Sequence, residues 1–212
     1  MKITIVYDNK KVIQTLKTDW GFSAVIETEG HNILFDAGGN GKILMGNLSR
    51  LNINPLIIDT IFISHHHFDH VGGLSAFLNQ QNNVRLFSPN SFRGVKNVRE
   101  NVYITDSREL YPNIYTTGEL DGIEQSLLIQ TAKGMVIVVG CSHPGLDQII
   151  KVAEQYGTLH AIIGGFHDFR RFQYLEKADI LCPAHCTRYM EEIKMQYPEK
   201  YLEAGAGRVV HL

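Results

Sequence analysis

The chain has 212 residues, of which 44% are hydrophobic, and its 20 basic and 22 acidic side chains give a formal net charge of −2. This balance excludes a strongly basic surface for nucleic acid or anionic membranes, so the expected partner is a small-molecule substrate. No apolar run approaches the roughly 18 residues of a membrane helix and the start has no cleavage site, so we expect a soluble, unprocessed protein with one domain over 1–212. The sequence does not indicate an oligomeric state.

The first third of the chain alternates between strand-like and helix-like segments. Three short segments rich in Val, Ile and Phe end at Gly or Asp and predict strands, namely 2–8, 23–30 and 32–38. Residues 41–52 place leucines at i, i+4 and i+7, which is one apolar face of a helix. The apolar segment 59–64 then predicts a strand that runs into a group of histidines, and a second helix follows that group.

The second half repeats the order of strand, histidine and helix. Segment 134–140 predicts a strand that leads to His143, and the helix after it has apolar residues on one face. Segments 160–166 and 179–184 predict strands that end at His167 and His185. Ligand sites in layered folds collect at strand ends, so these histidines are expected to converge.

Residues 88–125 differ in composition from the rest of the chain because they are polar and show no regular pattern. We interpret them as a loop-rich excursion over the surface. At least one of its four cationic side chains is expected to hold an anionic group of the substrate. These are Arg93, Lys96, Arg99 and Arg108.

The densest histidine cluster is the sequence HHHFDH at 65–70. Alternate residues of an extended segment point the same way, so His65 and His67 can bind one metal ion while His66 points away. Asp69 and His70 follow a turn and can reach a second ion, and ions roughly 3.5–4 Å apart are a common arrangement for activating water.

With Gly72-Gly73, His143 and His185, this cluster resembles the metallo-β-lactamase superfamily. The segments LFDAG, SHHHFDHVGGL, KGMVIVVGCSHPG, IIGGFH and CPAHCT are similar to the branch named for dihydropterin ribofuranosyl-aminobenzene phosphate synthase. The resemblance implies an α/β fold of the αββα sandwich type, with two sheets inside and helices outside. It also implies two divalent metal ions, with zinc expected first and iron or manganese as alternatives.

The resemblance further implies the role of each residue. His65, His67 and His143 would hold the first ion, and a bridging water or hydroxide would be the nucleophile. Asp69, which we expect to act in catalysis, would hold the second ion with His70 and His185. Asp36 matches an aspartate that orients a metal-bound histidine, with a turn-forming role as the alternative.

One departure from the superfamily concerns the bridging aspartate, because the chain has Gly164-Gly165-Phe166-His167 at that strand end. We expect His167 to bind one metal or to donate to substrate, and Asp168 is the rival for the missing carboxylate. Without a bridging carboxylate, the second site should bind its ion more weakly than the first.

The chain has three cysteines, an odd number that argues against a disulfide framework and favours a cytoplasmic location. We interpret Cys141, Cys182 and Cys186 as buried thiols beneath the site, with thiolate ligands or redox activity as the alternative.

The function expected first is a metallo-hydrolase that acts on a small ester, thioester or phosphoester through a metal-activated water. One alternative is the condensation of a dihydropterin diphosphate with a ribosyl-aminobenzene phosphate. A non-catalytic metal or metabolite sensor is another. A di-iron oxidoreductase is disfavoured, because such relatives carry an acid where this chain has His67 and no flavin module is attached.

Overall fold

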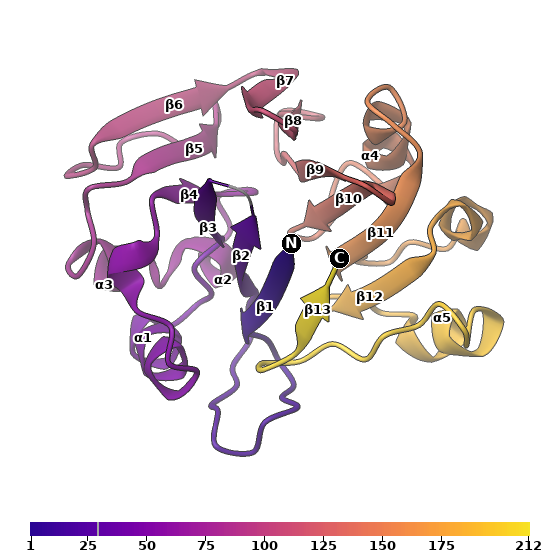
Figure 1. The fold of residues 1–212 in the computed structure, drawn as a ribbon, viewed down its shortest axis with the longest axis horizontal. Coiled ribbons are helices and arrows are strands. Elements are labelled where there is room, and N and C mark those ends of the chain that lie inside the picture. Colours follow the sequence, from indigo (N-terminus) through magenta and orange to yellow (C-terminus); the bar gives the residue numbers. More distant parts are fainter. Residues whose placement is uncertain (29) are drawn as a thin grey trace.

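The computed structural model describes residues 1–28 and 30–212, so Glu29 in the predicted strand 23–30 lies outside the described residues. Two β-sheets face each other at the centre, and helices cover the outer face of each (Figure 1). This is the αββα sandwich that the resemblance implied. Within the described residues, every helix is too short or too polar to span a bilayer.

The first sheet has seven strands, antiparallel from β13 to β3 and parallel from β3 to β6. Its order is β13 (Val209–His211), β1 (Lys2–Tyr7), β2 (Ser23–Thr28), β3 (His31–Phe35), β4 (Thr60–Phe62), β5 (Arg85–Pro89) and β6 (Glu100–Ile104). The helices on this side of the chain are α1 (Gly41–Arg50), α2 (Phe68–Val71) and α3 (Leu74–Leu78), with a 3₁₀ turn at Pro55–Ile57. The side chain of Asn40 caps α1 by accepting from the N–H groups of Lys42 and Ile43.

The second sheet has six strands, parallel only from β10 to β12. Its order is β12 (Ile180–Ala184), β11 (Leu159–Gly165), β10 (Gly134–Val139), β9 (Leu127–Thr131), β8 (Ile114–Gly118) and β7 (Asp106–Tyr111). Helices α4 (Leu146–Ala153) and α5 (Met190–Gln196) follow β10 and β12, and a 3₁₀ helix spans Phe172–Lys177.

Buried apolar side chains explain the four layers. Along β10, Val136 and Val138 point into the core between the sheets, whereas Met135 and Ile137 pack in the core beneath α4. A strand buried on both faces reads as a continuous apolar run, which is why 134–140 could be recognised from sequence. On the other side, Leu44 and Leu48 of α1 pack in a third core against the first sheet.

The prediction of a loop-rich excursion over 88–125 is wrong for much of its length, because that segment contains β6, β7 and β8. β6 is the last strand of the first sheet and β7 the last strand of the second, so this segment carries the chain from one sheet to the other. Edge strands are commonly charged because charge discourages pairing with other chains. Arg108 on β7 is exposed in this way. The polar composition of these edge strands therefore led to the wrong prediction of a loop.

Candidate metal centre

Strand ends from both sheets bring the predicted site residues together. The non-glycine residues with positive φ include Asp36, Ser142, His167 and His185, which follow β3, β10, β11 and β12. Left-handed backbone is uncommon outside glycine and concentrates at functional sites. The chain therefore turns sharply where each of these strands meets the site.

The first group of possible metal ligands contains His65, His67 and His143, whose donor atoms lie within 4.8 Å of one another. Nε2 of His65 lies 3.1 Å from Nδ1 of His67. Nε2 of His143 is buried and has no hydrogen-bond partner among the described residues. An unpaired buried nitrogen beside two imidazoles is costly unless a ligand satisfies it, so this group fits a metal ion. His66 is exposed, as the alternation of side chains predicts.

The second group contains Asp69, His70, Cys141 and His185, again with donor atoms within 4.8 Å. Nε2 of His185 lies 3.0 Å from Oδ2 of Asp69, and Nε2 of His70 lies 3.2 Å from Sγ of Cys141. His70, Cys141 and His185 are buried, and Asp69 is partly buried. The structure thus adds a sulfur atom to the donors expected from the sequence.

Asp36 and Ser64 set the tautomers of two of these histidines. Oδ2 of Asp36 accepts from the Ser64 hydroxyl and lies 2.7 Å from Nδ1 of His70. Since the Ser64 hydroxyl donates to Asp36, it accepts from Nδ1 of His65 at 2.9 Å. Nε2 of both histidines is thereby left as a lone pair directed at the site, and metal-binding histidines typically have their other ring nitrogen hydrogen-bonded in this way.

Asn9, just after β1, does the same for His185. Its Oδ1 accepts from the backbone N–H of Gly21 at 3.1 Å, so it also accepts from Nδ1 of His185 at 3.0 Å. In neutral His185 the proton is therefore on Nδ1, and the lone pair of Nε2 faces a lone pair of the Asp69 carboxylate. Two acceptors 3.0 Å apart need a proton or a cation between them, which again fits a metal ion.

Glu124 is a functional candidate that the sequence did not reveal. Its buried carboxylate accepts from four successive backbone N–H groups, those of Gly140, Cys141, Ser142 and His143, at 2.9–3.2 Å. It therefore holds the loop that carries one ligand of each group. No pattern marks Glu124, because it is one acidic residue in a segment interpreted as surface loop and its partners lie 16 to 19 residues later.

The pKa values of most histidines in the site favour the neutral imidazole. Burial, together with the neighbouring histidines, lowers the pKa of His143 to about 4 and lowers the pKa of His65 well below its usual range. Burial also lowers the pKa of His185. In the opposite direction, burial alone would lower the pKa of His70, but the Asp36 carboxylate raises it. Neutral imidazole is the form that binds a metal.

Asp69 contributes negative charge to the second group. Burial by itself would raise the pKa of this carboxyl, but its contacts with His185 and His70 hold the pKa well below its usual range. Asp69 is the acid expected from the sequence, and it lies between the two histidines of the group, 3.6 Å from Nε2 of His70.

His167 and Asp168 lie at the edge of this arrangement. The His167 side chain is 45% exposed and that of Asp168 is 74% exposed, and the two contact each other at 3.2 Å. The His167 ring is 5.1 Å from the His143 ring, yet His167 belongs to neither group of donors. Direct binding of a metal by His167 stays a prediction, and its position suits contact with a substrate.

Trp20 lies beside the centre and was not singled out by the sequence patterns. Its ring lies 4.8 Å from that of His185, although 59% of the residue is exposed. Phe68, which lies between His67 and Asp69 in the sequence, is 73% exposed. Exposed aromatic side chains beside polar donors are typical of a ligand-binding surface.

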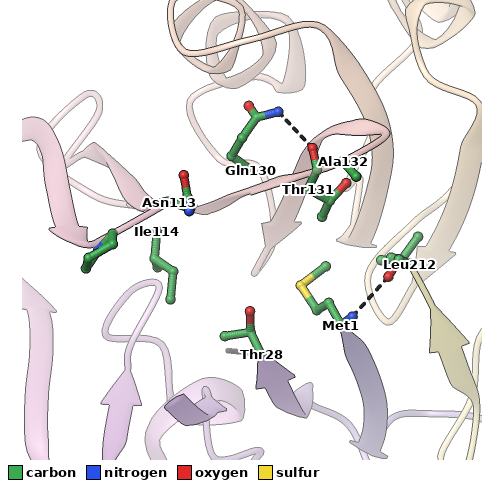
Figure 2. A pocket seen from close by; sticks show the side chains of 9 residues that line it. Met1, Thr28, Asn113, Ile114, Gln130, Thr131, Ala132 and Leu212 are labelled. Carbon is green, nitrogen blue, oxygen red and sulfur yellow. Dashed lines mark hydrogen bonds between the residues drawn. The ribbon is translucent and has the colours of Figure 1, made fainter. Parts of the chain in front are cut away.

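Two cavities bear on the other expectations. Arg93 and Lys96 line one of about 430 Å³ beside Val71 of α2, and Arg99 and Arg108 are not among its lining residues. Figure 2 shows another cavity, whose lining includes Thr28 and Thr131. Its volume is about 520 Å³, and it lies at the ends of β2 and β9 that are far from the histidines. None of its lining residues belongs to either donor group.

Comparisons with known proteins agree with this geometry. The model of the metallo-beta-lactamase superfamily matches residues 21–110. The chain is 30% identical, over 90% of its length and 89% of the relative's, to 7,8-dihydropterin-6-methyl-4-(beta-D-ribofuranosyl)-aminobenzene-5'-phosphate synthase of Methanocaldococcus jannaschii. The chain belongs to the metallo-β-lactamase superfamily, in the branch that includes this synthase.

Solved structures share the fold over the whole chain. A metal-dependent hydrolase of the β-lactamase superfamily matches with a TM-score of 0.80 and 21% identity, over 100% of this chain and 99% of the other. The metallo-beta-lactamase fold protein YhfI of Bacillus subtilis matches with a TM-score of 0.72 and 12% identity, over 99% and 98%. At these identities the likeness supports the fold alone.

Proposed function

We propose that this protein is a metal-dependent hydrolase with two divalent ions, acting on a small ester, thioester or phosphoester. The observation that carries the proposal is the convergence of two sets of donor atoms, with the tautomers of His65 and His70 set by outer partners and with a buried Nε2 of His143 that has no partner among the described residues. Imidazole, carboxylate and thiol donors favour zinc over magnesium or calcium.

Each residue has a definite part in this proposal. His65, His67 and His143 hold one ion through three nitrogens, and Asp69, His70 and His185 hold the other. Metal ions at such a site supply a water of lowered pKa and polarise the scissile group. Asp36 and Asn9 keep the imidazoles in the binding tautomer, and the exposed His167 is placed to donate to substrate.

The test begins with elemental analysis of protein purified without added metal, followed by a panel of phosphodiesters, thioesters and esters. We expect about two ions per chain, turnover of at least one class, loss of turnover on chelation, and recovery on adding zinc. Protein that binds no divalent ion, or that keeps full turnover after complete chelation, would contradict the proposal.

The second candidate function is synthase chemistry, which joins a dihydropterin to a ribofuranosyl-aminobenzene phosphate. The 30% identity to a named synthase over 90% of the chain supports this candidate about as well as the fold supports hydrolysis. Turnover of the dihydropterin partner with and without the aromatic amine separates them. A hydrolase consumes its substrate without the amine, whereas a synthase requires both reactants.

A further inference from the structure

The end of β11 has no room for a side chain that could reach the second group. A Cβ atom on Gly164, whose φ is +125°, would lie 2.0 Å from the Val139 carbonyl oxygen. A Cβ atom on Gly165 would lie 2.4 Å from the Gly140 carbonyl oxygen and 2.6 Å from Sγ of Cys186. The side chains of the next two polar residues, His167 and Asp168, are 45% and 74% exposed, and neither belongs to the second group of donors. This strand end therefore contributes no anionic ligand of its own.

Two thiols occupy the space beside these glycines. Sγ of Cys186 lies next to Gly165 and 3.9 Å from the carbonyl oxygen of Cys141. The Cys141 residue is only 3% exposed, and its backbone N–H donates to Glu124 at 2.9 Å. The backbone of Cys141 is thus held in place by the Glu124 carboxylate.

The Cys141 sulfur and the His70 imidazole are directed at the same point. Nδ1 of His70 is engaged by Asp36, so its Nε2 lone pair faces Sγ of Cys141 at 3.2 Å. Asp69 and His185 complete the group, with all four donor atoms within 4.8 Å. Two nitrogens, one carboxylate oxygen and one sulfur are four donors of the kinds that zinc binds.

We propose that Cys141 binds the second metal ion as a thiolate and supplies the anionic ligand that the end of β11 does not provide. The inference rests on the proposed dinuclear site. Binding forms a bond between sulfur and metal and breaks the S–H bond, and the proton leaves to solvent. Thiolate and Asp69 together give the second group two negative charges, which offset the repulsion between neighbouring dications.

Cobalt(II) tests the proposal directly, because a cobalt–thiolate bond gives an intense charge-transfer absorption that nitrogen and oxygen ligands do not. Metal-free protein is titrated with cobalt(II) under a metal-free phosphine reductant, and bound ions are counted by elemental analysis. The proteins compared are the wild type, Cys141→Ser, Cys186→Ser and Cys182→Ser. Cys182 is a buried core residue and serves as the matched control.

We expect two ions and the sulfur band in the wild type, Cys182→Ser and Cys186→Ser. Cys141→Ser should lose the band and the second ion, at cobalt concentrations that saturate the wild type, while it keeps one ion. Proton release on metal binding, measured by calorimetry in buffers of different ionisation enthalpy, should be smaller in Cys141→Ser than in the wild type. If Cys141→Ser fails to fold, a band that survives in the other two variants still assigns the sulfur to Cys141.

Two results overturn the inference. Wild-type protein that binds two cobalt ions without the sulfur band would show a site of nitrogen and oxygen ligands, and the proposed function would stand without Cys141. A band that disappears in Cys186→Ser but not in Cys141→Ser would assign the sulfur ligand to Cys186 instead of Cys141. Wild-type protein that binds no cobalt contradicts the dinuclear site itself.

Discussion

The two donor groups differ in burial and in charge. In the first group the donors are three imidazoles; His65 is buried and hydrogen-bonded to Ser64, whereas His67 and His143 are partly exposed. In the second, Asp69 adds a carboxylate, Cys141 adds a thiol, and the two histidines have outer partners in Asp36 and Asn9. A group that is neutral and open suits a position for water and substrate. A group that is anionic and buried suits tight retention of an ion.

This contrast bears on the order in which the sites fill. The sequence led us to expect a weaker second site, because a bridging carboxylate is missing. Burial, outer partners and a second anionic donor favour the reverse order, since each raises affinity for a cation. Zinc titration of metal-free protein by calorimetry decides between them: with the second group tighter, the first ion bound is lost in His70→Ala and kept in His67→Ala.

Replacing a ligand of either group should have the largest effect. His67→Ala and His70→Ala should each remove one ion and lower turnover by about 10³-fold, which corresponds to several kcal/mol at about 1.36 kcal/mol per tenfold. His66→Ala is the control, because His66 is exposed and should leave metal content and turnover nearly unchanged. Equal metal loss in His66→Ala and His67→Ala would refute the assignment.

Asp36→Asn should weaken the second ion more than the first. Asp36 contacts His70 directly but reaches His65 only through Ser64, and loss of such partners commonly costs about 10–100-fold in metal affinity. Zinc affinity of each site is measured by competition with a chromophoric chelator. Asp168→Asn, an exposed carboxylate beside the centre, is the control. Equal weakening of the two sites would show that Asp36 does not distinguish them.

Glu124→Gln should lower stability without changing either ligand set. In the variant an amide NH₂ replaces one carboxylate oxygen and faces the backbone N–H of His143, which donates to that oxygen in the wild type. Loss of this acceptor should lower the free energy of unfolding by about 1–3 kcal/mol. Urea unfolding of the metal-free protein measures the loss, and Glu119→Gln, a partly buried neighbour that accepts a hydrogen bond from the backbone N–H of Ser91, is the control. Unchanged stability would mean that the loop at 140–143 is held by other contacts.

The smallest predicted effect is a difference in pH dependence. Burial lowers the pKa of His143 to about 4 in the folded chain, against an ordinary value of 6.5, so the unfolded chain binds more protons between these values. The contribution of His143 to stability is therefore present above pH 6.5 and is lost as the pH falls toward 4. Metal-free His143→Gln should lose less stability than wild type between pH 7 and 5, as measured by thermal unfolding. Parallel curves for the two proteins would contradict this.

The parts of the fold that could be predicted are those in which local pattern and burial agree. β10 and β11 are buried on both faces and read as unbroken apolar runs, and α4 has a clear apolar face. β6 and β7 could not be recognised, because edge strands exposed to solvent carry charge and look like loop. Their assignment depends on which strands lie beside them, and that is a property of the whole chain.

For the site, the sequence by itself was enough to select the histidines and Asp69 as candidate ligands, because histidines and acids placed at strand ends leave a spacing that can be read locally. Tertiary structure alone decided which residues support them. Asn9 meets His185 across 176 positions, and Glu124 and Cys141 take their roles only when β10 and the loop before β9 come together. Hydrogen bonds and metal sites depend on distances in space, and a folded chain sets those distances through packing between segments that its sequence keeps far apart.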